Sequence, residues 1–162
     1  MLVRYSLLAI LLLAMAGVIY CDGGWRRIPN FITLPLMVIG LVAQGLMHGW
    51  LGMGYSVAGF LVGAGLFFPL YWLRGMGAGD LKLIAAIGAF LSLRLIFSVV
   101  FFTVLSGGVL GLAWLVLGRT KWHGQAVQAL EEQPLAATLP YGWAIVSGTI
   151  LTLCFHPAEV WL

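Results

Sequence analysis

The sequence predicts an all-α, polytopic membrane protein with about six transmembrane helices, of which the fourth is short. Hydrophobic residues make up 62% of the chain and charged residues only 8%, whereas a soluble globular domain carries about 25% charged residues. The apolar residues gather in runs that approach the roughly 20 residues needed to cross a bilayer. With 162 residues the chain leaves no room for a separate soluble domain. We therefore expect one integral-membrane domain over residues 1–162.

Each predicted helix corresponds to one apolar run. Five runs approach full length: Tyr5–Cys21, Phe31–Met47, Tyr55–Leu73, Leu95–Gly118 and Thr138–Phe155. The run Leu81–Leu93 is shorter and covers only about 20 Å. We expect it to form a fourth helix that begins within the protein near Gly79 and lets Arg94 reach the far interface.

The first apolar run also resembles a cleavable secretory signal, because Arg4 precedes it and Ala14-Met15-Ala16-Gly17 lies within it. The run stays apolar as far as Cys21, and five further runs follow it. We therefore expect the first helix to be retained.

The basic residues predict the orientation in the membrane. With six helices, three loops share one side, and those loops and their edges hold Arg26, Arg27, Arg74, Lys82, Arg119 and Lys121. The other side receives only Arg4 and Arg94. Because basic loops favour the cytoplasm, we expect the first group to face the cytoplasm and both termini to lie outside. The same scattered residues account for the net charge of +3, so we expect no binding of nucleic acid.

The most informative residues are the only two aspartates, Asp22 and Asp80. Each lies where a long apolar run meets a polar loop, and the predicted orientation places both on the cytoplasmic side. A carboxylate at a membrane boundary is costly to keep, so it indicates a functional site. Gly77 and Gly79 precede Asp80, which permits an abrupt helix start and a close approach by another chain.

Structural interpretations of these residues remain open. Asp80 could cap the fourth helix, because Asp is favoured at that position. Asp22 could pair with Arg26 or Arg27 at the interface. Pro29 suits the first turn of the second helix, and we expect Lys82 to extend toward the membrane surface.

Two carboxylates within hydrogen-bond distance share a proton, because they cannot both ionise cheaply. One then serves as general base on a water and the other as general acid toward the scissile amide, as in aspartic proteases. This chemistry needs no cofactor. No Cys and His residues have metal-ligand spacing, and no Gly-x-Ser-x-Gly motif is present. We expect Glu131 and Glu132 to be solvated. As a hypothesis, their negative charge attracts a basic peptide.

The chain resembles the type IV prepilin peptidases, which are membrane aspartic proteases with a Gly-x-Gly-Asp motif. Three segments in the same order carry the resemblance: Asp22 followed by Arg27-Ile28-Pro29-Asn30, then Gly77-Ala78-Gly79-Asp80-Leu81-Lys82, then Leu139-Pro140-Tyr141-Gly142. The resemblance implies that Asp22 and Asp80 are catalytic, supported by motif residues in all three segments: Arg27, Pro29, Asn30, Gly77, Gly79, Lys82, Pro140, Tyr141 and Gly142.

The resemblance also implies a substrate and a place in the cell. The partner would be a prepilin or pseudopilin with a basic leader and an apolar segment, cut at the cytoplasmic face of a bacterial inner membrane. The chain resembles a short form of the family, because it lacks the Cys-x-x-Cys motifs of larger relatives. Methyltransferase activity is therefore not expected.

Two other functions are compatible with the sequence. A small proton-coupled transporter would use the aspartates as proton carriers. It would be expected to place them near the middle of the membrane and to show an internal repeat, and neither feature is evident. A non-enzymatic subunit of pilus assembly would use the aspartates only to cap helices. The sequence does not predict the oligomeric state.

Overall fold

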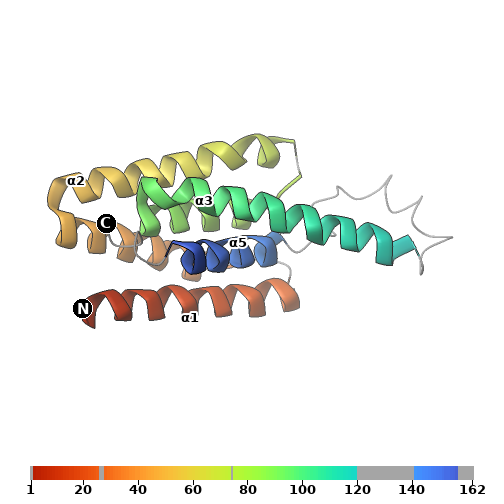
Figure 1. Ribbon diagram of the computed structural model, residues 1–162, viewed down its shortest axis with the longest axis horizontal. Helices are drawn as coiled ribbons and strands as arrows, with labels where there is room; N and C mark the ends of the chain where they lie inside the picture. The colour runs from red at the N-terminus through yellow and green to blue at the C-terminus, as the bar shows by residue number, and fades with distance from the viewer. Residues whose placement is uncertain (1, 26–27, 74, 120–140, 157–162) are drawn as a thin grey trace.

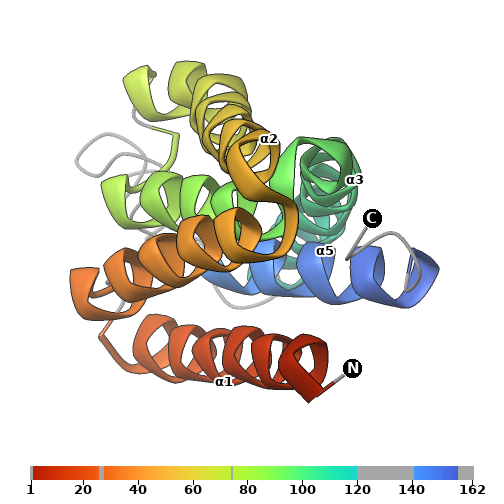
Figure 2. The same ribbon diagram turned by 90° about the vertical axis from the view of Figure 1, so that its left-hand side faces the viewer.

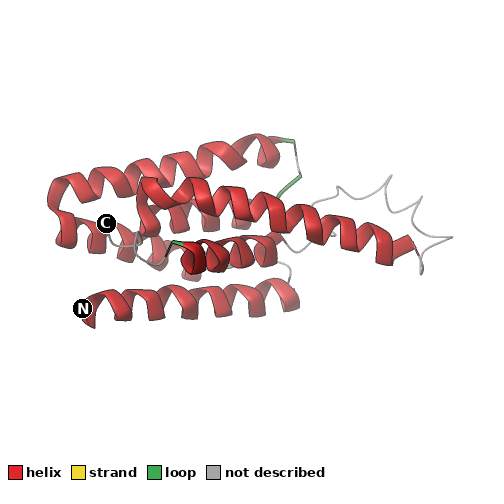
Figure 3. Ribbon diagram, in the orientation of Figure 1, coloured by secondary structure: helices red, strands yellow, loops and turns green. Residues whose placement is uncertain are grey.

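The protein is a bundle of α-helices. The computed structural model describes residues 2–25, 28–73, 75–119 and 141–156. Within these ranges the elements are α1 (Leu2–Trp25), α2 (Asn30–Trp72), α3 (Ala78–Arg119) and α5 (Tyr141–Phe155), and none of the described residues forms a strand (Figures 1 and 3). The predicted all-α class is confirmed.

Helix α2 turns back on itself at Gly49. Its 43 residues would span about 64 Å if straight, about twice the hydrocarbon thickness. Gly49 has non-helical angles, φ 64° and ψ −152°, which are open chiefly to glycine. A Cβ atom on Gly45 would lie 2.8 Å from Met53 Cγ, although residues eight apart in a straight helix are about 12 Å apart. The two arms, 30–48 and 50–72, therefore run antiparallel.

Helix α3 also changes direction. A Cβ atom on Gly63 would lie 3.3 Å from the Ile84 side chain and 3.2 Å from the Ile96 side chain, yet these two residues would be about 18 Å apart in a straight helix. Two consecutive carbonyls of α3 accept hydrogen bonds from α2, from Ser56 Oγ to Ala89 at 2.5 Å and from Gln44 Nε2 to Phe90 at 3.1 Å. The bend thus has buried polar partners. Arg94, on its far side, is exposed as expected.

The first arm of α3 forms the centre of the bundle. All nine residues from Leu83 to Leu91 are buried, which explains why the short predicted helix is so uniformly apolar. The two arms of α2 and helix α5 pack around it. Helix α1 lies along one side (Figure 2) and contributes one buried face, spaced at helical intervals: Leu7, Leu11, Met15 and Val18.

The number of membrane crossings stays a prediction. Three described segments are long and apolar enough to cross a membrane, Tyr5–Gly23, Asn30–Trp72 and Leu93–Ala113. The count falls below six because Asn30–Trp72 counts once although it turns back at Gly49, the first arm of α3 is short, and α5 has only 15 residues. The chain is a membrane protein, but six spans are not confirmed.

Several helices begin or end at the same end of the bundle. Helix α1 ends there, α2 both begins and ends there, and α3 and α5 begin there (Figure 1, right of the bundle). The start of α1 lies at the opposite end (Figure 1). Segments that are far apart in the sequence therefore meet at one end.

Candidate active site

Asp80 lies in the first turn of α3, as its third residue. Its Oδ2 atom accepts a hydrogen bond from the backbone N–H of Gly77 at 3.3 Å. This contact is one half of a capping box, in which a side chain at the third helical position reaches back to the residue before the helix. The structural interpretation of Asp80 is thus partly right, although Asp80 caps from within the helix and Gly77 holds the N-cap position.

Asp22 lies near the end of α1 and is only 6% exposed. Its carboxylate packs against the start of α5, where a Cβ atom on Gly142 would lie 2.5 Å from Asp22 Oδ2. Asp22 therefore points into the bundle. The suggested partners Arg26 and Arg27 lie outside the described residues, so that pairing stays untested.

The two carboxylates influence one another. The pKa of Asp80 is raised from 3.8 to about 7, mainly by burial and next by the charge of Asp22. The hydrogen bond from Gly77 acts in the opposite direction and lowers this pKa. Asp80 precedes the candidate span Leu93–Ala113. A carboxyl group with a pKa near neutrality, beside a second carboxylate, is an arrangement typical of acid–base catalysis.

The loop before α2 packs directly on the Gly-x-Gly-Asp motif. A Cβ atom on Gly79 would lie 3.1 Å from Ile28 Cβ and 3.2 Å from the Ile28 carbonyl oxygen. Ile28 is buried, so the absence of a side chain at Gly79 lets the loop approach the helix next to Asp80. Sequence reasoning missed this role of Ile28; the signal was an apolar residue within an otherwise polar segment.

Three further motif residues, Pro29, Asn30 and Lys82, lie at the starts of α2 and α3. Pro29 is the N-cap of α2, with φ −75° and ψ 143°, one position before the helical turn in which the sequence placed it. Its carbonyl accepts the N–H of Ile32 at 3.1 Å. Lys82 Nζ donates to Asn30 Oδ1 at 3.1 Å, so Lys82 is exposed as expected but is engaged by the neighbouring helix.

The third motif segment is described only in part. Helix α5 begins at Tyr141, which is half-buried, and continues with Gly142, which is buried. Trp143 reaches toward the end of α1, where its ring lies 3.7 Å from the Cβ position of Gly23. Arg27, Pro140, Glu131 and Glu132 lie outside the described residues.

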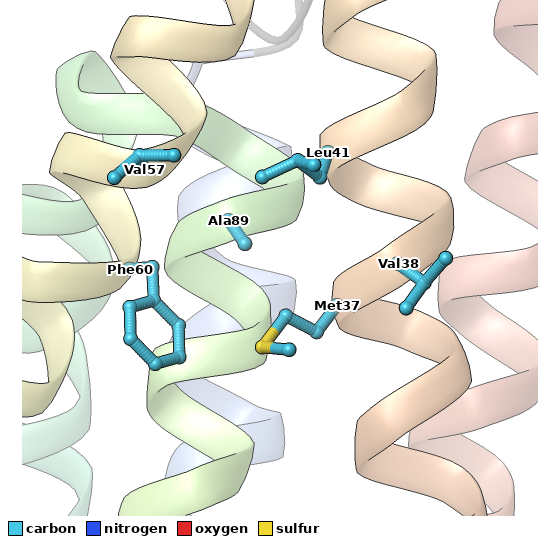
Figure 4. Close-up of a pocket in the computed structure, with 6 residues that line it drawn as sticks. All are labelled: Met37, Val38, Leu41, Val57, Phe60 and Ala89. Carbon is cyan, nitrogen blue, oxygen red and sulfur yellow. The ribbon is translucent and has the colours of Figure 1, made fainter.

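An apolar cavity of about 210 Å³ lies away from this site. It is lined by residues of both α2 arms and of α3: Met37, Val38, Leu41, Val57, Phe60 and Ala89 (Figure 4). No motif residue lines it. Within the described part of the chain, no three His, Cys, Asp or Glu residues are grouped where they could hold a metal ion.

Comparison with known proteins identifies a family. The model of the type IV leader peptidase family matches residues 6–112, which include Asp22, the Ile28–Asn30 loop and Asp80. Similar proteins include the prepilin leader peptidase/N-methyltransferases of Xanthomonas campestris pv. campestris, 35% identical over 67% of this chain and 39% of the relative, and Burkholderia pseudomallei, 30% identical over 89% and 43%. A Bacillus subtilis protein of the same name is 31% identical over 83% of this chain and 49% of its own length.

The chain thus matches less than half of the length of each of these relatives. No solved structure matches the chain.

Proposed function

The chain belongs to the type IV leader peptidase family, and on this basis we propose that it is a membrane aspartic endopeptidase that removes the leader of prepilin-like proteins. The observation that supports the proposal most is the effect of Asp22 on Asp80, since burial and the charge of Asp22 raise the pKa of Asp80 to about 7. The relatives' printed names supply the substrate class.

In the proposed mechanism the two aspartates hold one proton between them near neutral pH. The ionised carboxylate removes a proton from a water molecule, which attacks the scissile carbonyl carbon. The protonated carboxyl group donates its proton toward the amide as the C–N bond breaks. The pair is thereby ready for another cycle, and its pKa values belong to both residues together.

The surrounding residues prepare this geometry. Gly79 admits the Ile28 loop beside Asp80, and the hydrogen bond between Lys82 and Asn30 joins the starts of α2 and α3. In the proposal, the substrate's cleavage junction enters at this end while its apolar segment lies along the helices in the bilayer. The start of α5, at Tyr141 and Gly142, packs against Asp22 on the other side.

The six basic residues predicted on one side support a position of this end at the cytoplasmic face of an inner membrane, with both termini outside. A basic leader would then reach the aspartates without crossing the bilayer. The methyltransferase activity in the relatives' names is not part of the proposal, and the expectation that this chain lacks it stays a prediction.

One observation favours an alternative function. The Gly77–Asp80 hydrogen bond is what a non-enzymatic assembly subunit with capping aspartates would show. The location of both aspartates at one end gives less support to proton transport, which favours carboxylates near the middle of the membrane.

The test is cleavage of a prepilin-type substrate by the full chain in lipid vesicles, with mass spectrometry of the products. We expect cleavage between leader and apolar segment by the wild type, and a loss of at least about 10²-fold for Asp80→Asn. Arg94→Gln, a substitution of an exposed residue at the bend of α3, is the matched control and should cut normally. Full cleavage by Asp80→Asn would favour the capping interpretation.

A further inference from the structure

We infer that Gly142 is a positioning residue, whose missing side chain leaves the space in which the Asp22 carboxylate lies. The inference rests on the proposed function and assigns a mechanical role to the start of α5. A Cβ atom at Gly142 would lie 2.5 Å from Asp22 Oδ2, 2.9 Å from Cγ and 3.3 Å from Cβ. The first two distances are shorter than carbon and oxygen atoms tolerate, so even alanine at this position must displace something.

Helix α5 is poorly able to move away. Ser106 Oγ of α3 donates to the Ala144 carbonyl at 2.9 Å. One turn further along, the backbone of Gly148 lies so close to Thr103 that a Cβ there would be 2.5 Å from the Thr103 nitrogen. Ala144, Ile145 and Val146 are each at most 2% exposed. The start of α5 is therefore fixed to α3 by contacts within two turns of Gly142.

Helix α1 packs less extensively on the bundle than the other helices, but near Asp22 its residues Val18 and Cys21 are buried. The group left to yield is the side chain of Asp22, which rotates about its own bonds at far smaller cost than a buried helix shifts. A methyl group at Gly142 would thus turn the carboxylate away from its present place beside Asp80.

This displacement has a consequence that a general loss of stability does not produce. The charge of Asp22 contributes to the raised pKa of Asp80, so moving that charge away brings the pKa of Asp80 down. The other titratable groups in the described elements at this end are Tyr20 and Cys21 of α1, Tyr71 of α2, Tyr141 of α5 and Lys82 of α3, which is engaged with Asn30 of α2.

The experiment compares Gly142→Ala with two glycine variants in the full chain. Gly148→Ala introduces an equally tight overlap on the same helix, against Thr103 and away from Asp22, and Gly108→Ala fills open space on α3. We expect Gly142→Ala to lower kcat on the order of 10²-fold with little change in KM, and to shift the alkaline limb of the pH profile to lower pH. Gly148→Ala should lower the yield of folded protein without moving the limb, and Gly108→Ala should change neither.

A readout that needs no substrate separates this inference from the proposed function. Infrared titration of the protonated carboxyl stretch, assigned by its loss in Asp80→Asn, should show a lower midpoint in Gly142→Ala than in the wild type. If the wild type fails to cut prepilin substrates, this midpoint shift still supports the positioning role. An unchanged midpoint and pH limb in folded Gly142→Ala would overturn the inference.

If Gly142→Ala does not accumulate, a double variant answers the question. Asp22→Ala removes the atoms that the new methyl group meets, so Gly142→Ala should cost much less melting temperature or yield in that background. An equal loss in both backgrounds would show that Gly142 contacts something other than Asp22, and would overturn the inference.

Discussion

Asp22 near the end of α1 lies close enough to Asp80, in the first turn of α3, for its charge to raise the pKa of Asp80. After burial, the Asp22 charge is the second cause of the rise in the pKa of Asp80 from 3.8 to about 7. Each carboxylate also packs against a glycine, Asp80 against Gly77 and Asp22 against Gly142. A glycine thus leaves space for each of the two carboxylates.

The first prediction concerns the pH dependence of cleavage. Because the active pair carries one proton and the pKa of Asp80 is about 7, activity should fall as pH rises through about 7, when that proton is lost. The measurement is kcat/KM between pH 5 and pH 9 in vesicles of constant composition. A profile that stays flat to pH 9 would contradict the shared proton.

The second prediction concerns stability. The pKa of folded Asp80, about 7, lies above the ordinary value of 3.8, so the folded state binds this proton more tightly than the unfolded state. The resulting stabilisation is fully present below the ordinary pKa and is lost as pH rises through about 7. Asp80→Asn, which carries no titrating group, should therefore gain melting temperature relative to the wild type at pH 8 more than at pH 5.

Thermal denaturation of both proteins in the same detergent at the two pH values measures this difference. Arg94→Gln, whose parent side chain is exposed, is the control and should show no such pH-dependent gain. An equal effect of Asp80→Asn at both pH values would speak against a buried, protonated Asp80.

The third prediction concerns Gly79. In Gly79→Ala the new methyl group would lie 3.1 Å from Ile28 Cβ and 3.4 Å from the Ile28 nitrogen, so the loop before α2 must shift. We expect cleavage to fall at least roughly tenfold, about 1.4 kcal/mol in activation free energy. Gly65→Ala, which meets open space on α2, is the matched control, and equal rates for the two variants would remove the proposed role of Gly79.

The fourth prediction concerns the turn within α2. Gly49 has φ 64° and ψ −152°, so Gly49→Ala should destabilise the fold by about 1–3 kcal/mol through backbone strain. Because the turn lies at the end of the bundle away from Asp80, kcat per folded molecule should stay unchanged. Equilibrium unfolding with Gly54→Ala as control measures the effect, and a stability equal to that control would contradict the assigned strain.

The sequence predicted the parts of the fold that composition and apolar runs determine. The runs Phe31–Met47 and Tyr55–Leu73 correspond to the two arms of α2, and Leu81–Leu93 corresponds to the buried first arm of α3. It did not predict the bend of α3, because the carbonyls of Ala89 and Phe90 are bound there by tertiary partners, Ser56 and Gln44 of α2. Hydrophobicity carries no signal for such contacts.

For the site, sequence reasoning singled out Asp22, Asp80 and the glycines before Asp80, because charged residues are so rare in this chain. The structure brings them to one end together with Asn30, Lys82 and Gly142. The packing of Ile28 on Gly79 and of Asp22 on Gly142 could not be predicted, because both contacts join segments separated by more than 50 residues. The catalytic roles themselves stay predictions.

The most direct test of the central claim is a comparison of cleavage rates for wild type, Asp22→Asn, Asp80→Asn and the double variant, each at equal amounts of folded protein. If the two aspartates act as one unit, each single substitution should cost at least about 10²-fold and the double variant should be no slower than the slower single variant. Full activity in either single variant, or losses that multiply in the double variant, would contradict a shared-proton pair.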